Sequence, residues 1–278
     1  MISMLGGGVR ENRAKARLAA GEVAFGTLSL VPEPGLPEIA GAAGLDFFVI
    51  DMEHAAIAGQ EVAHMVRACQ ASGTTALIRV RQADEKTFLW VLDTGVEGLM
   101  IPLVEDAATA RSAYDLSHFP LGGSGSRTIC SASRAAGHGA YRADLEPYIE
   151  NTNRELLLIA LLETPGAVAK AKEIAQEPID VFIVGRADLS LKMGFPYAPR
   201  HPAVMDAAKR ALADVMEAGK TAGVLAYSVD EAQDWIRFGC RFIIYSQPEM
   251  ILAIQYRDAV ASLRNSPAPN WDLARVRS

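Results

Sequence analysis

Long apolar runs, paired cysteines and an excess of basic charge are all missing from this sequence of 278 residues. No run approaches the roughly 20 consecutive apolar residues that a membrane-spanning helix needs, and the first residues contain no apolar stretch of signal-peptide length. The three cysteines, Cys69, Cys130 and Cys240, are far apart and odd in number, which argues against a disulfide framework and a CxxC metal site. We therefore expect a cytoplasmic protein with no membrane partner.

The balance of charge is acidic, with 27 Lys and Arg residues against 33 Asp and Glu residues and a formal net charge of −6. Nucleic-acid-binding proteins usually carry a basic stripe, so we expect no nucleic-acid partner. Half of the residues are apolar, which is enough for a sizeable core in a chain of this length. We expect a single domain over residues 1–278, with an N-terminal segment at 1–20 and a C-terminal tail at 264–278.

Strand-like apolar runs alternate with helical patterns along the chain. The expected strands are residues 23–30, 45–50, 75–80, 98–104, 156–162, 181–184, 223–227 and 241–245. The expected helices are residues 11–20, 34–43, 60–72, 84–94, 105–116, 165–176, 201–218, 229–238 and 248–263. Eight strand–helix units in order predict an α/β fold, namely a (β/α)8 TIM barrel. The alternative is a doubly wound open sheet, but the first strand–helix turn lacks the GxGxxG pattern.

Polar side chains follow several of the expected strands. The set is Asp51, Glu53, His54, Arg79, Glu163 and Asp188. In a barrel the carboxyl ends of the strands share one rim, so these side chains are expected to converge. Two carboxylates on successive strand ends, Glu163 and Asp188, suit a site for a hard metal ion. The alternative is that each carboxylate only caps the helix that follows it.

Several segments together resemble a known family. They are residues 44–55, 78–80, 92–95, 101–104, 163–164 and 185–194, with D-x-E-H-A at 51–55 and G-x-A-D-L-S at 185–190 as the most specific. In this order, over roughly residues 21–262, they resemble the HpcH/HpaI family of class II, metal-dependent pyruvate aldolases. The resemblance implies a TIM barrel that binds a small-molecule 2-oxo acid and an aldehyde.

The resemblance also implies a metal site. Glu163 and Asp188 resemble the two carboxylate ligands of a divalent cation, with Mg²⁺ or Mn²⁺ favoured and Co²⁺ or Zn²⁺ as alternatives. The 2-oxo acid would chelate this cation, which would act as a Lewis acid while an enolate forms. Arg79 resembles the arginine beside the keto oxygen. The backbone around Gly185, Ala187 and Asp188 would hold the substrate carboxylate.

Proton transfer is assigned by the same resemblance. His54 resembles the family's base, and Asp93 resembles the carboxylate that orients its imidazole ring from a neighbouring subunit. Asp51 is expected to support the same network. Glu53 would point away from Asp51 and His54 if the strand continued. Arg127, in the long Gly- and Ser-rich region 120–140, resembles a substrate-binding arginine of the family, although its register is displaced by a residue.

Two positions depart from the family pattern. Leu161 stands where the family usually has Gln, so a hydrogen-bonding group near the metal waters is lost or supplied elsewhere. Arg186 stands where the family usually has Pro, and we expect it to add a cation at the mouth of the site. Both departures put the identity of the substrate in doubt.

The resulting prediction is a carbon–carbon lyase that interconverts a 4-hydroxy-2-oxo acid with pyruvate, or a close 2-oxo acid, and an aldehyde. No lysine occupies an expected inner strand end, so no Schiff base is implied. One alternative keeps the enolate chemistry but decarboxylates oxaloacetate or acts on citrate-like acids. Another is a barrel that binds metal and a 2-oxo acid without turnover.

The last expected helix is apolar on more than one face, with Met250, Ile251, Ile254, Tyr256 and Val260. This pattern predicts packing against a second surface, and the resemblance implies a homo-oligomer, a hexamer built as a trimer of dimers that exchange this helix. The alternative is an ordinary eighth barrel helix covered by the C-terminal tail.

Overall fold

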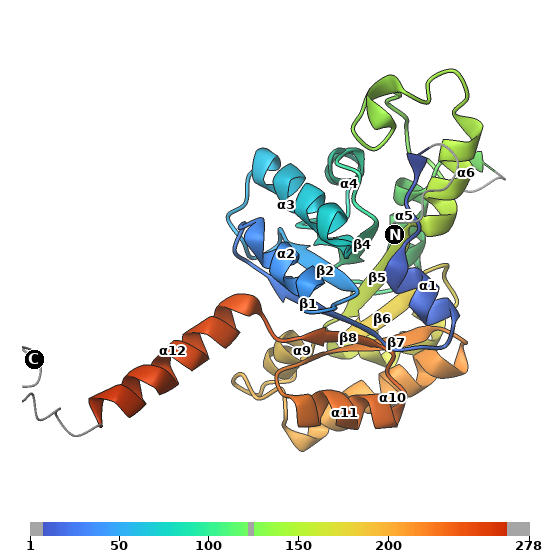
Figure 1. Cartoon of the computed structure of the whole chain (residues 1–278). Helices are drawn as coiled ribbons and strands as arrows, with labels where there is room; N and C mark the ends of the chain where they lie inside the picture. Colours follow the sequence, from blue (N-terminus) through green and yellow to red (C-terminus); the bar gives the residue numbers. More distant parts are fainter. Residues whose placement is uncertain (1–7, 122–124, 266–278) are drawn as a thin grey trace, which may run out of the picture.

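A closed barrel of eight parallel strands, paired in sequence order from β1 to β8, forms the centre of the molecule (Figure 1). The computed structural model describes residues 8–121 and 125–265. The strands are β1 (Ala24–Ser29), β2 (Phe47–Asp51), β3 (Thr75–Arg79), β4 (Gly98–Ile101), β5 (Leu157–Leu162), β6 (Val181–Val184), β7 (Thr221–Ala226) and β8 (Phe242–Tyr245). The predicted TIM barrel is confirmed, and the open-sheet alternative is wrong because β1 pairs with β8.

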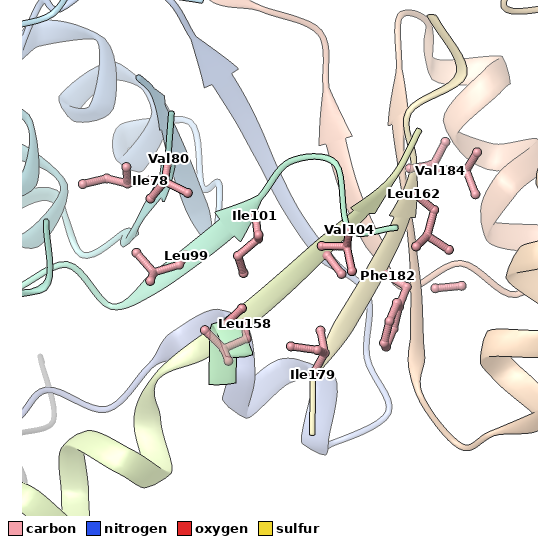
Figure 2. Packing of buried hydrophobic residues seen from close by; sticks show 14 of the residues in the cluster. Ile78, Val80, Leu99, Ile101, Val104, Leu158, Leu162, Ile179, Phe182 and Val184 are labelled. Atoms are coloured by element: carbon pink, nitrogen blue, oxygen red, sulfur yellow. The ribbon is translucent and has the colours of Figure 1, made fainter. Parts of the chain in front are cut away.

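Successive residues of each strand face opposite sides of the barrel wall, as the pleat of a strand requires. In β2, Phe47 and Val49 belong to the interior cluster, where Phe47 stacks on Phe242 with ring centroids 4.1 Å apart. Phe48 and Ile50 belong to the larger cluster between the strands and the helices. Figure 2 shows outward-facing members of that second cluster on β3 to β6. The same alternation decides which residues beyond each strand point inward.

Helices surround the strands. They are α1 (Arg13–Ala19), α2 (Gly35–Ala42), α3 (Gly59–Ser72), α4 (Glu85–Asp93), α5 (Ala107–Ser117), α6 (Glu146–Glu155), α7 (Pro165–Ala169), α8 (Ala171–Ile174), α9 (Arg186–Lys192), α10 (Pro202–Glu217), α11 (Val229–Phe238) and α12 (Pro248–Arg264). Helix α1 closes the amino-terminal end of the barrel, because Ala14 and Leu18 pack with the interior cluster and the Ala14 N–H donates to Thr75 Oγ1 at 3.1 Å.

Three helical segments differ from the predictions. Helices α6 and α9 were not predicted, and the helix expected at 165–176 is divided at Lys170 into α7 and α8. Within the described part of region 120–140 the only regular element is a short 3-10 helix, Gly137–Gly139. Residues 122–124 of that region lie outside the described residues, as do 1–7 of the N-terminal segment and 266–278 of the tail.

Helix α12 stands away from the barrel (Figure 1). None of its residues is buried, and it exposes large apolar side chains, among them Ile251, Ile254 and Val260. Among the residues that the structure describes, no helix is long and apolar enough to cross a membrane. This exposure agrees with the prediction that α12 packs against a second surface. The identity of that surface stays a prediction.

Candidate active site

Inward-facing residues at the carboxyl ends of β2, β3 and β5 are polar, whereas those deeper in the barrel are apolar. Asp51 continues the inward series of Phe47 and Val49 by two residues, and Glu163 continues that of Ile159 and Leu161. Arg79 follows Leu77 in the same way. The alternation of strand residues therefore aims these three side chains at one end of the barrel.

Asp51 and Arg79 form a buried ion pair. Arg79 donates from Nε to Asp51 Oδ1 at 2.9 Å and from Nη2 to Asp51 Oδ2 at 2.6 Å. Burial alone would lower the pKa of Arg79, but the hydrogen bonds and charge of Asp51 outweigh it and raise that pKa. A bidentate contact of this kind fixes the plane of the guanidinium group. Arg79 is thus a permanent, oriented cation.

Asp51 also organises the residues that follow it. Its Oδ1 accepts hydrogen bonds from the backbone N–H of Glu53 at 2.9 Å and of His54 at 3.4 Å. The expectation that Glu53 points away is wrong, because residues two apart in a strand share a face and Glu53 lies near Arg79 and His54. Glu53 Oε2 lies 3.3 Å from Arg79 Nε and 3.7 Å from His54 Nε2. Burial, partly offset by Arg79, raises the pKa of Glu53.

Glu163 is held over the cavity without serving as a helix cap. The neighbouring Thr164 caps α7 instead, because its Oγ1 accepts from the Ala167 N–H at 3.0 Å. Glu163 Oε2 accepts from the Leu103 N–H at 2.8 Å. Leu103 has φ +53°, a conformation disfavoured for leucine that turns this N–H toward Glu163. Burial, with the negative charges of Glu53 and Asp188, raises the pKa of Glu163.

Gly185 leaves room for the side chain of Glu163. A Cβ atom at this position would lie 2.6 Å from Glu163 Cγ and 2.8 Å from Glu163 Oε1. We had expected Gly185 to contribute backbone to the binding of a substrate carboxylate. Its φ of −74° is accessible to any residue, so the requirement for glycine here comes from the close approach of Glu163.

Asp188 lies in the first turn of α9 and faces the same charges. Its negative charge contributes to the raised pKa of both Glu53 and Glu163. Carboxylate oxygens with too little positive charge around them suit a hard divalent cation. No cluster of three or more His, Cys, Asp or Glu side chains able to hold a metal is found within residues 8–121 and 125–265. Glu163 and Asp188 both line the same cavity.

A cavity of about 110 Å³ lies at this end of the barrel. Its polar side is formed by Arg79, Glu163, Gly185, Arg186, Ala187 and Asp188. The remaining wall is mostly apolar or aromatic and is formed by Leu28, Met100, Leu161, Ile183, Val184, Tyr197, Pro199, Leu225, Tyr227 and Ile244. The two tyrosines and the Leu103 N–H were not anticipated, because no local sequence pattern marks them.

Arg186 lines the cavity, where a cation was expected, but its charge is paired. Its Nη2 donates to Glu231 Oε1 at 2.7 Å and to the Leu225 carbonyl at 2.7 Å, and its guanidinium lies 5.3 Å from the Trp235 ring centroid. The side chain is buried and its charge is paired with Glu231. The pairing was not anticipated, because the partner lies on α11, 45 residues further along the chain.

Asp93 and Arg127 do not join the other candidates within one chain. Asp93 is the last residue of α4, just before β4 begins, and therefore lies at the amino-terminal end of the barrel. Arg127 is buried with its guanidinium 4.3 Å from the Phe119 ring centroid. Burial raises the pKa of Asp93, and the nearby charge of Arg127 opposes that shift. His54, in contrast, is exposed at the opposite rim.

Known proteins resemble this chain over most of its length. A family model described as HpcH/HpaI aldolase/citrate lyase matches residues 29–245. A 2-keto-3-deoxy-L-rhamnonate aldolase of Escherichia coli K12 is 32% identical over 251 residues, which cover 90% of each chain.

Two solved structures share the fold. One is an HpcH/HpaI aldolase/citrate lyase family protein from Burkholderia cenocepacia J2315, with a TM-score of 0.86, 30% identity, and coverage of 91% of this chain and 100% of that one. The other is the citrate synthase SbnG, with a TM-score of 0.81, 26% identity, and coverage of 91% and 98%.

Proposed function

The chain belongs to the HpcH/HpaI aldolase/citrate lyase family, and from this premise we propose that it is a divalent-cation-dependent carbon–carbon lyase acting on 4-hydroxy-2-oxo acids. Cleavage would give pyruvate, or a close 2-oxo acid, and an aldehyde. The observation that carries the proposal is that Glu163, Asp188 and Arg79 line one cavity at the carboxyl-terminal end of the barrel.

Glu163 and Asp188 are the groups that would hold the cation. Their oxygen ligands favour Mg²⁺ or Mn²⁺, with Co²⁺ or Zn²⁺ as alternatives. When bound, the cation would supply Lewis-acid chemistry to the 2-oxo acid. Burial, together with the negative charges of Glu53 and Asp188, raises the pKa of Glu163, and a bound cation would oppose that shift, which supports this role.

Arg79 and the backbone at the start of α9 would bind the substrate. Arg79, oriented by Asp51, presents a fixed positive charge where negative charge develops on the 2-oxo oxygen. Helix geometry leaves the N–H groups of Ala187 and Asp188 without intrahelical acceptors, so they can donate to the substrate carboxylate.

His54 would move the proton. In the cleavage direction it takes the proton of the 4-hydroxyl group, and in the synthetic direction it returns that proton. Asp93 would orient the imidazole, but it lies at the other end of its own barrel. The proposal therefore requires the Asp93 of a second copy, in a homo-oligomer such as a trimer of dimers. The exposed apolar surface of α12 supports assembly.

The wall of the cavity favours an apolar aldehyde portion in the substrate. Leu161, Leu225 and Tyr227 line the cavity and would contact the carbon chain beyond the 2-oxo group. Arg186 lines the same cavity, but its charge is paired with Glu231. Burying a second carboxylate without a cation is costly, so dicarboxylic substrates should be used less well.

Oxaloacetate decarboxylation, or reaction with a citrate-like acid, is the second candidate. Leu161 favours it, because an apolar side chain replaces the usual Gln of the family and lines the cavity. The similarity to the citrate synthase SbnG also keeps this chemistry open. Arg186 lends it no support, since its guanidinium group is engaged by Glu231 and the Leu225 carbonyl.

The test is a pyruvate-release assay on a panel of 4-hydroxy-2-oxo acids with apolar or carboxylate-bearing tails. Release should stop with EDTA, return with Mg²⁺ or Mn²⁺, and fall by about 100-fold or more in Glu163→Gln and Asp188→Asn. Calorimetric titration with Mn²⁺ should show that the same variants lose the cation. Asp206→Asn, an exposed acid on α10, is the matched control and should keep both properties.

Two outcomes would decide against parts of this proposal. Pyruvate release that continues in EDTA would show that the reaction does not need the cation. Consumption of oxaloacetate, with no release from any hydroxy acid, would favour the second candidate and direct attention to Leu161.

A further inference from the structure

A second cavity, of about 360 Å³, lies at the other end of the barrel. It is bounded by residues 8–10, the turn between α4 and β4, the loop residues 127–138 and helix α6. It shares no lining residue with the cavity of Glu163 and Asp188. Because the α4–β4 turn precedes a strand whereas Glu163 follows one, the two cavities lie toward opposite ends of the barrel.

Three arginines line this second cavity: Arg10, Arg127 and Arg134. Arg127 is 5% exposed, donates a hydrogen bond to the Tyr148 side chain, and has no hydrogen-bond partner for its Nε among the described residues. Burial lowers the pKa of Arg127. A buried guanidinium with an unused donor normally meets an acceptor.

Arg10 also has unused donors. Its Nε and Nη1 are buried and make no hydrogen bond within the described part of the chain, although Nη1 lies 3.5 Å from Glu97 Oε1. Arg134 is held by its Nη1 bond to the Thr94 carbonyl at 2.6 Å and its Nη2 bond to Gln70 Oε1. Gly95 permits that approach, since a Cβ there would lie 2.7 Å from Arg134 Nη1.

Two acidic residues line the same cavity, and both are occupied by other contacts. Glu97 accepts the Ala76 N–H through Oε2 at 2.8 Å, and burial raises its pKa to about 7, so near neutral pH it carries only part of a negative charge. Glu155 accepts the Asn12 N–H at 2.9 Å and pairs with Arg154 at 3.1 Å. Positive charge therefore exceeds negative charge around this cavity.

We propose that this second cavity binds a small molecule carrying two negative charges on oxygen atoms, through the guanidinium groups of Arg10, Arg127 and Arg134. The ligand class is a phosphate ester or a dicarboxylate, since arginine forks match both groups. A cavity of 360 Å³ accommodates such a molecule. The site does not depend on the reaction proposed for the other end of the barrel.

The test uses the full chain stripped of metal with EDTA, titrated calorimetrically with sulfate and, separately, with succinate. At least one of these anions should bind with one site per chain, and the better probe distinguishes a phosphate-like from a dicarboxylate ligand. Arg10→Gln and Arg134→Gln should each weaken binding by about 10-fold or more. Arg142→Gln, on an exposed arginine of the same region, is the matched control.

Two further measurements separate loss of anion binding from loss of folding and from binding in the other cavity. Circular dichroism confirms that each variant is folded before it is titrated. Asp188→Asn should bind the anion with unchanged affinity, because Asp188 lies in the other cavity. Failure of both anions to bind folded protein, equal binding by the arginine variants, or loss of binding in Asp188→Asn would each overturn the proposal. None of these outcomes depends on whether the chain cleaves a hydroxy acid.

Discussion

Gly185 and Glu163 show how closely one residue can constrain another across two strands. The Glu163 side chain occupies the space in which a Cβ at position 185 would lie. Since Glu163 is also fixed by the Leu103 N–H, it has little freedom to move aside. The position of this carboxylate therefore depends on the absence of a side chain on the next strand.

We predict that Gly185→Ala displaces Glu163 and impairs the site more than the fold. Overpacking of this kind costs about 1–3 kcal/mol of stability, whereas a displacement of about 1 Å can reduce a rate by about 100-fold. Thermal unfolding and Mn²⁺ titration measure the two effects separately. Gly166→Ala is the control, because a Cβ there meets nothing closer than 3.8 Å. Unchanged Mn²⁺ affinity in Gly185→Ala would contradict the prediction.

Residue by residue, the sequence identified the inner side chains better than their partners. Asp51, Arg79 and Glu163 follow directly from strand ends and the alternation of inward residues, which are local properties. The contact of Arg186 with Glu231 is not local, so its position could not be anticipated. Glu53 was misjudged because a residue two positions after Asp51 falls on the same face of an extended chain, not on the opposite one.

At the scale of elements, apolar periodicity decided which helices could be predicted. Helix α6 buries only Tyr148, and α9 has seven residues, so neither offers the repeating pattern that marks a helix. The strands were located well because both of their faces are buried, which gives continuous apolar runs. The exposure of α12 agrees with the packing against a second surface that its apolar residues on more than one face predict.

We predict that polar substitution on α12 disrupts assembly without unfolding the barrel. Because no residue of α12 is buried within one chain, Ile251→Asp together with Ile254→Asp should leave the barrel fold intact. Light scattering after gel filtration should show a smaller particle than the wild type, with unchanged circular dichroism. Arg257→Asp, a change at an exposed charged position of the same helix, should not alter particle size. Equal masses for all three proteins would rule out α12 as a contact between copies.

At the scale of the whole molecule, the protonation of Glu97 makes the stability of the fold depend on pH. Its Oε2 accepts the Ala76 N–H of β3, and its carbonyl accepts a hydrogen bond from Asn12 at the start of α1. Burial raises its pKa from 4.5 to about 7. The folded chain therefore keeps a proton that the unfolded chain releases between these two pH values, and stability falls as pH rises through this window.

We predict that Glu97→Gln removes this pH dependence. One pKa unit corresponds to about 1.4 kcal/mol. Relative to Glu97→Gln, the free energy of unfolding of the wild type should therefore fall by about 3 kcal/mol between pH 4.5 and pH 7. Urea unfolding at both pH values, at one fixed protein concentration, measures it. Glu146→Gln, an exposed acid on α6, is the control. Parallel profiles for wild type and Glu97→Gln would show that Glu97 does not couple to folding.

Glu163 and Thr164 are adjacent in the chain but have separate structural roles. Because Thr164 alone starts α7, the residue before it contributes nothing to the start of that helix. A substitution at Glu163 should therefore change the charge at the rim of the barrel while the helix that follows keeps its place. Adjacent residues of this barrel are thus open to separate change, one altering the site and the other the architecture.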